Sequence, residues 1–252
     1  MKKAILVFVL LAVAICAFVS CNRQEKNAVS ISIGGDASLT LMTSPFGNPL
    51  STLDLPAPKS LDNCTLCNYL DAKLSDIIAT SGPYQGEGSD CFYVAGTFYL
   101  KNAGANSLSY REKITLGESA KKSVKALRVL VIRSLDAMEG EIAVYAAPKA
   151  DGSAEEVVPT SRFFTTGYKP RENAEKYQSF AFDEEDIRED GIWMTKPFAS
   201  DTCALESDYY PLHSGETVKY TLLIWLEGND EQCTDDILGE TLGLTMTFSV
   251  RD

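Results

Sequence analysis

The sequence predicts an all-β fold: an antiparallel, jelly-roll-like β-sandwich with a short helical insertion near residues 60–82. Three observations carry this prediction. Residues 242–251 alternate strictly between apolar and polar side chains, as a strand with one buried and one solvated face does. Residues 124–132 and 218–226 are almost continuously apolar and rich in branched side chains, which is typical of strands covered on both sides.

The first half of the domain is expected to contain short strands and one helix. Val29, Ile31 and Ile33 alternate with small or polar residues, and a second apolar stretch follows at 39–42. Several prolines between 43 and 60 predict a loop there. After it, one helical face is expected to collect the apolar side chains of Cys67, Leu70, Leu74, Ile77 and Ile78, and Gly82-Pro83 ends the helix.

The second half of the domain is expected to be almost entirely β. Strands are predicted at 92–100 and, after a turn at 102–107, at 108–116. The apolar run at 124–132 is expected to pair with 142–146 across a turn at 136–140, whereas 148–200 is polar and irregular. No internal repeat of fixed period is visible, so residues 29–252 are taken as a single β-sandwich domain.

Trp225 is predicted to be a core anchor and not a ligand-binding residue. It shares one face of its strand with Leu223, while the other face carries Val218, Tyr220, Leu222, Ile224 and Leu226. Because both faces are largely apolar, the strand is expected to lie inside its sheet.

The N-terminal segment reads as a bacterial lipoprotein leader. Lys2 and Lys3 precede an uncharged apolar run at 4–18, which has the length of a signal-peptide core and is short for a membrane span. The run ends in Val19-Ser20-Cys21, where Cys21 is expected to be acylated and to become the new N-terminus. We therefore expect a signal peptide at 1–20, a lipidated linker at 21–28 and a location in the cell envelope, outside the cytoplasm. The alternative is an ordinary cleaved leader with an incidental cysteine.

The charge of the chain limits its partners. The 252 residues carry a formal net charge of −12, and loss of Lys2 and Lys3 makes it more negative. Such a surface repels nucleic acid and anionic lipid, so lipid is expected to provide the membrane anchor. The remaining partner classes are a surface protein and a surface glycan. A glycan would need exposed aromatic platforms, and the alternative is that these side chains pack in the core. The candidate platforms are Trp193, Tyr168, Tyr209 and Tyr210.

Five further cysteines are disulfide candidates in an oxidising exterior: Cys64, Cys67, Cys91, Cys203 and Cys233. We expect a bond between Cys203 and Cys233, and a bond from Cys91 to either Cys64 or Cys67. The Cys64-Thr65-Leu66-Cys67 pair at a helix start also allows a redox dithiol or, with Cys91, a zinc site. Neither is favoured, because no βαβ pattern surrounds the pair and no fourth zinc ligand stands out.

Catalytic and metal-binding motifs are sparse. The single histidine, His213, lies in a predicted turn, and no nucleophile elbow accompanies it. Acidic residues at 183–190 form one cluster, and Glu227, Asp230, Asp235 and Asp236 form another that offers weak calcium ligands. Neither cluster has EF-hand spacing, so solvated loops are the preferred interpretation and no cofactor is expected.

Two segments resemble the TasA/camelysin-like exported proteins, a likeness that covers roughly residues 91–250. The first runs from Phe98 to Gly104 and on through Leu108-Ser109-Tyr110, and the second from Trp225 to Asp230 and on through Cys233 and Ile237-Leu238-Gly239. The resemblance implies a jelly-roll sandwich, export, and a role in extracellular fibres or biofilm matrix. The lipoprotein leader and Gly239-Glu240, in place of a common Gly-Gly, depart from the family pattern. The metallopeptidase activity described for camelysin-like proteins is not carried over, because one histidine cannot form a His-Glu-x-x-His motif.

The expected function is therefore a non-enzymatic, lipid-anchored bacterial surface protein with an adhesion, biofilm-matrix or fibre-associated role. The alternatives are a fimbrillin-like pilus or anchor subunit, and a surface glycan-binding module or hydrolase.

We predict that mass spectrometry of the membrane-extracted protein finds a diacyl or triacyl cysteine at position 21 as the N-terminal residue. Cys21→Ala should abolish both the modification and the membrane association, because one or more acyl chains supply the anchoring energy. The matched control Cys16→Ala, inside the apolar run, should leave both unchanged. A free N-terminus at any other residue would contradict the prediction.

Overall fold

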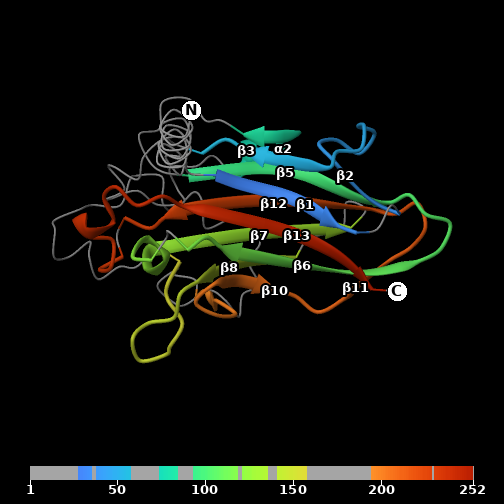
Figure 1. The fold of residues 1–252 in the computed structure, drawn as a ribbon. Helices are drawn as coiled ribbons and strands as arrows, with labels where there is room; N and C mark the ends of the chain where they lie inside the picture. Colours follow the sequence, from blue (N-terminus) through green and yellow to red (C-terminus); the bar gives the residue numbers. More distant parts are fainter. Residues whose placement is uncertain are drawn as a thin grey trace, which may run out of the picture.

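The computed structural model describes the chain over residues 28–35, 38–57, 74–84, 93–118, 121–135, 141–157, 194–228 and 230–251. Two β-sheets pack face to face, and the strands of both run along the long axis of the molecule (Figure 1). The all-β sandwich predicted from the sequence is confirmed. No helix in the described part of the chain is long and apolar enough to cross a membrane.

Sheet A has six strands in the order β10-β6-β13-β1-β3, with β11 also paired to β6. Its bounds are β1 Ala28–Gly34, β3 Thr52–Leu55, β6 Leu108–Leu116, β10 Cys203–Glu206, β11 Tyr210–Leu212 and β13 Gly243–Arg251.

Sheet B has seven strands in the order β2-β5-β12-β7-β8-β9, with β4 also paired to β5. Its bounds are β2 Leu39–Met42, β4 Gly82–Tyr84, β5 Tyr93–Asn102, β7 Leu127–Leu135, β8 Glu141–Ala146, β9 Lys196–Pro197 and β12 Thr217–Leu226. The predicted pairing of the 124–132 and 142–146 segments is confirmed as the antiparallel pair β7–β8.

Most neighbouring strands are antiparallel, but two pairs are parallel. β1 runs parallel to β13, with Ala28 opposite Gly243 and Gly34 opposite Ser249, and β8 runs parallel to β9. Alternation of apolar and polar residues shows which face of a strand is buried, but it carries no information about the direction of the neighbour. The parallel pairs were therefore not foreseen.

The main core fills the space between the sheets. Inward side chains of β12 meet those of β5 and β13 there, and the Tyr220 ring lies 5.4 Å from Phe98 and 5.1 Å from Phe248, centroid to centroid. A second apolar cluster covers the other face of sheet B, where Leu223 and Trp225 pack with Ile77. Since β12 is buried on both faces and Trp225 is only 1% exposed, the predicted inner strand and core tryptophan are confirmed.

The segment between β2 and β5 differs from expectation. The predicted loop at 43–60 contains the short edge strand β3, whose Leu53 and Leu55 point into the core. Of the predicted helix, the structure describes α2, Leu74–Ala79, which packs on β5 through a 2.7 Å hydrogen bond from Thr97 Oγ1 to the Ile77 carbonyl. Cys67 and Leu70 lie outside the described residues.

The sandwich has two distinct ends. At the proximal end, where β1 begins, Ala28 N donates to the Leu242 carbonyl and Gly117 N to the Gly243 carbonyl. At the distal end, where β13 stops, the turn after β5 meets the turn before β12. The Asn102 amide ties them together by donating to the Asn106 and Leu212 carbonyls at 2.8 and 3.0 Å. The C label of Figure 1 lies at the distal end.

We predict that Trp225→Ala lowers the free energy of unfolding by about 3–5 kcal/mol, because the change leaves a cavity in the second apolar cluster. It also removes the Nε1–H that donates to Glu227 Oε2 at 3.1 Å. Phe46→Ala, which truncates a side chain that is 99% exposed, is the matched control and should leave the thermal midpoint unchanged. An unchanged midpoint for the tryptophan variant would overturn its assignment to the core.

Candidate functional site

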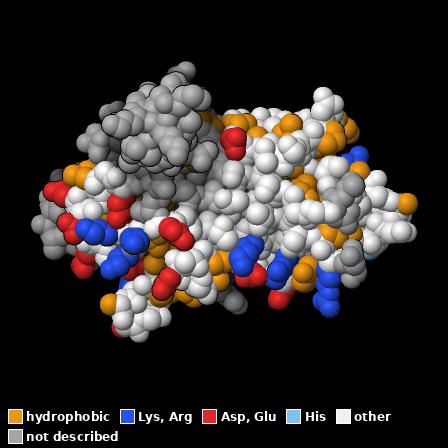
Figure 2. Space-filling view, in the orientation of Figure 1, with side chains coloured by type: hydrophobic (Ala, Val, Ile, Leu, Met, Phe, Trp, Pro, Cys, Tyr) orange, Lys and Arg blue, Asp and Glu red, His pale blue; other side chains and the backbone are white. Residues whose placement is uncertain are grey.

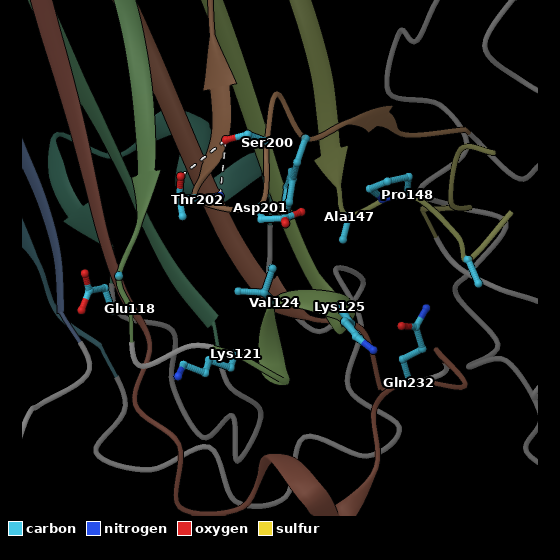
Figure 3. A pocket seen from close by; sticks show the side chains of 13 residues that line it. Glu118, Lys121, Val124, Lys125, Ala147, Pro148, Ser200, Asp201, Thr202 and Gln232 are labelled. Atoms are coloured by element: carbon cyan, nitrogen blue, oxygen red, sulfur yellow. Dashed lines mark hydrogen bonds between the residues drawn. The ribbon is translucent and has the colours of Figure 1, made fainter. Parts of the chain in front are cut away.

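A groove of about 1140 Å³ opens at the proximal end of the sandwich (Figure 3). Its walls come from the end of β6, the 3-10 helix η2 (Ser123–Ala126), the segment after β8 and the loop before β10. The lining side chains are Glu118, Lys121, Val124, Lys125, Ala147, Pro148, Phe198, Ser200, Asp201, Thr202 and Gln232.

The lining of this groove combines apolar and charged side chains. Phe198 and Val124 give it an apolar floor, while Lys121, Lys125 and Asp201 place charges of both signs around the rim. Histidine and cysteine are absent from its described lining. The groove therefore offers apolar contact and charge pairing to a bound molecule.

A buried polar cluster lies between the sheets, about halfway along β6. Glu112 points inward from β6 in the row of Tyr110 and Ile114 and is 4% exposed. Tyr220 of β12 donates a hydrogen bond to its carboxylate, and the Tyr220 and Tyr110 hydroxyls lie 3.0 Å apart. The other carboxylate oxygen, Oε2, is buried without a hydrogen-bond partner in the described structure.

Burial controls the titration of this cluster. It raises the pKa of Glu112 from 4.5 to about 7, against the opposing effects of the Tyr220 hydrogen bond and the Arg133 charge. Burial likewise raises the pKa of Tyr110 to about 12 and the pKa values of Tyr145 and Tyr220 above their ordinary range. At neutral pH the cluster therefore holds neutral tyrosines around a carboxyl that is close to half-protonated.

Arg133 of β7 separates this cluster from solvent at the lateral edge of the sandwich. Its guanidinium lies 3.4 Å from the centroid of the Tyr210 ring and donates to Glu141 Oε2 at 2.7 Å. A carboxyl with a pKa near 7 suits general acid–base chemistry. Glu112, however, is enclosed by side chains of both sheets, so the arrangement affects stability rather than reaching a substrate.

The four calcium candidates do not converge in the structure. Glu227 is fully buried and accepts the Trp225 Nε1–H, and Asp230 pairs with the buried Arg128 guanidinium at 2.8 Å. Asp235 and Asp236 are exposed, and Asp236 lies 3.5 Å from Lys122 Nζ. Across the described residues, no group of three or more His, Cys, Asp or Glu side chains could hold a metal ion.

Cys203 and Cys233 are buried but are not bonded to each other, so the predicted disulfide between them is not formed. Cys203 lies on the edge strand β10 of sheet A, where its Sγ–H donates to the Leu205 carbonyl at 3.2 Å. Cys233 follows β12 of sheet B and packs in the main core. The residues just before the two cysteines, Ser200–Thr202 and Gln232, line the same groove, but each thiol is buried separately and the two are not joined. Cys21, Cys64, Cys67 and Cys91 lie outside the described residues.

Two of the four aromatic residues proposed as platforms for sugar are described, and they differ in exposure. Tyr210 packs against the main core, whereas its neighbour Tyr209 is 36% exposed. His213 is exposed in the distal turn, as predicted, with its Nδ1 3.0 Å from Ser107 Oγ. Tyr168, Trp193 and the acidic cluster at 183–190 are outside the described residues.

Sequence reasoning missed three buried charged residues of the described chain, Glu112, Arg128 and Glu155. A signal for Glu112 was present, because it occupies an inward position between Tyr110 and Ile114 in the alternation of its strand. Arg128 interrupts an apolar run, and its need for a buried partner, here Asp230, follows from the cost of burying an unpaired charge.

A comparison of the chain with protein-family models finds no match, and a comparison with curated proteins finds none either.

We predict that the free energy of unfolding falls as the pH rises from about 4.5 to 7. In this window folded Glu112 keeps a proton that the unfolded chain has released, because its folded-state pKa is about 7 against an ordinary value of 4.5. The total change is about 3 kcal/mol. Glu112→Gln, whose amide does not titrate, should flatten the decline in urea melts taken across the window. The exposed control Glu118→Gln should keep it, and a Glu112→Gln profile parallel to wild type would contradict the prediction.

Proposed function

We propose that the protein is a lipid-anchored bacterial surface protein that acts by binding, in an adhesion, biofilm-matrix or fibre-associated role. The observation that carries the proposal is the polarity of the sandwich. β1, the first strand after the expected lipid site, begins at the proximal end, and β13 stops at the distal end. A lipid on Cys21 therefore holds the proximal end toward the membrane.

This orientation presents the distal turns to the surroundings. The Asn102 hydrogen bonds fix the turn after β5 against the turn before β12, and Ser214 Oγ adds a 2.6 Å bond to the Gly104 carbonyl. Turns held this firmly have little conformational entropy to lose when a partner binds. A rigid end opposite the proposed lipid site suits a protein that displays a binding surface.

The polar residues of the described core also support a binding role. The Arg128 guanidinium pairs with Asp230, and Glu227 accepts a hydrogen bond from the Trp225 indole. Glu112 is enclosed between the sheets. None of them reaches the floor of the proximal groove.

We predict that an epitope tag fused after Asp252 is stained by antibody on intact cells. β13 ends at the distal end, so a C-terminal tag should project away from the membrane. The same tagged chain carrying Cys21→Ala should lose cell-associated staining, because its lipid is gone. Staining of the tagged wild-type chain only after permeabilisation would overturn the proposed surface location.

A further inference from the structure

The outward face of sheet A carries two rows of small hydroxyl side chains. Ser30 of β1 lies opposite Thr245 of β13, which lies opposite Thr115 of β6, and one row further along Ser32 lies opposite Thr247. All five side chains are partly exposed. The space-filling view shows a broad white area in the middle of this side of the molecule, with Lys and Arg side chains interspersed with Asp and Glu along its lower edge (Figure 2). The sheet therefore offers a flat, polar surface without bulky aliphatic groups.

An exposed aromatic ring lies at the basic edge of this surface. Tyr209 is 36% exposed, and the guanidinium carbons of Arg111 and Arg251 each lie 5.5 Å from its ring centroid. The two arginines come from neighbouring strands, and Arg111 Nε also donates to Ser249 Oγ at 3.3 Å. The tyrosine ring thus lies close to two cations while part of it remains open to solvent.

Three cations lie along this edge in a chain whose formal net charge is −12, together with the carboxylates of Glu206 and the exposed Asp208. Arg111, Lys113 and Arg251 supply three cations, and Glu206 is the counter-ion of two of them. Its carboxylate lies 2.9 Å from both Arg111 Nη1 and Lys113 Nζ. These pairs are partly exposed, so they are weak and a competing anion can displace them.

We propose that Tyr209, Arg111, Arg251 and the hydroxyl rows of sheet A form a binding surface for an acidic polysaccharide. One sugar ring stacks on Tyr209, its carboxylate pairs with the arginines, and further sugars lie across the Ser and Thr side chains through hydrogen bonds. The proposal rests on the proposed binding role at the cell surface and gives that role a ligand class. An exposed ring beside a flat hydroxyl surface favours a sugar chain over an acidic protein, and the negative net charge disfavours nucleic acid.

The test measures binding of the full chain, extracted in detergent, to polygalacturonate as the acidic probe and to dextran as the neutral one. We expect binding to polygalacturonate alone, weakened by added salt. Tyr209→Ala and Arg251→Gln should each weaken it by about tenfold, the effect of losing one stacking or charge contact of about 1.4 kcal/mol. Tyr209→Phe, which keeps the ring, should bind as wild type does. Glu206→Gln should bind more tightly, because it frees two cations.

Lys122→Gln is the matched charge control, since Lys122 is exposed near the opposite end of the sandwich. Thermal melts establish that each variant is folded. Equal binding of both polysaccharides, or an equal loss in Lys122→Gln and Arg251→Gln, would overturn the proposal. The proposal would also be overturned if the wild-type chain self-associates in analytical ultracentrifugation and Arg251→Gln abolishes that association. The surface would then bind a second copy of this chain. Polysaccharide binding is measured on purified protein, whereas the surface location is tested by antibody staining of cells. A failure of the polysaccharide proposal is therefore distinguishable from a failure of the proposed surface role.

Discussion

The burial of β12 on both of its faces is the constraint on which the rest of the structure depends. Its inward side chains, among them Tyr220, contact β5 and β13 in the main core, while Leu223 and Trp225 face the second apolar cluster. Sheet B must therefore be covered on both sides, by sheet A on one and by α2 and its neighbours on the other. Sheet A needs only one covered face, because the outward residues of β13, β1 and β6 are polar. This asymmetry leaves one broad sheet face available for binding.

The parallel pairing of β1 with β13 links the fold to the proposed orientation. β1 lies inside sheet A between β13 and β3, so the sheet is complete only when the two ends of the domain sequence meet. Contacts between such distant segments slow folding, because a long loop must be ordered before they form. The same pairing sets β1 to start at the end of the sandwich where β13 starts. A tether ahead of β1 and the last residues of β13 consequently lie at opposite ends.

The charged groups inside the molecule divide into two kinds. Arg128 is paired with Asp230 at 2.8 Å and with Glu155 at 3.7 Å, and removing the arginine would leave two carboxylates without their buried cation. Glu112 has no cationic partner at that distance and is instead accommodated by a raised pKa and a hydrogen bond from Tyr220. Burying a protonated carboxyl lowers the free energy of unfolding little in mild acid. It lowers it more as the pH rises, because the unfolded chain then gains stability by releasing the proton. The stability of the core therefore depends on pH at Glu112.

The sequence by itself determined the fold class and the inward side of the main strands. In β13 and β12 the periodicity of apolar side chains depends only on which face is buried, and it placed Trp225 in the core correctly. It missed β3 because prolines around a short edge strand resemble a loop. Only the tertiary structure decided which strands are neighbours, and therefore that Cys203 and Cys233 are not bonded, that Asp230 pairs with Arg128 instead of joining a calcium site, and that Arg111 and Arg251 both lie near the Tyr209 ring. Each of these contacts joins residues from separate strands or loops, and strand order is set by the packing of the whole sandwich, which no local pattern records.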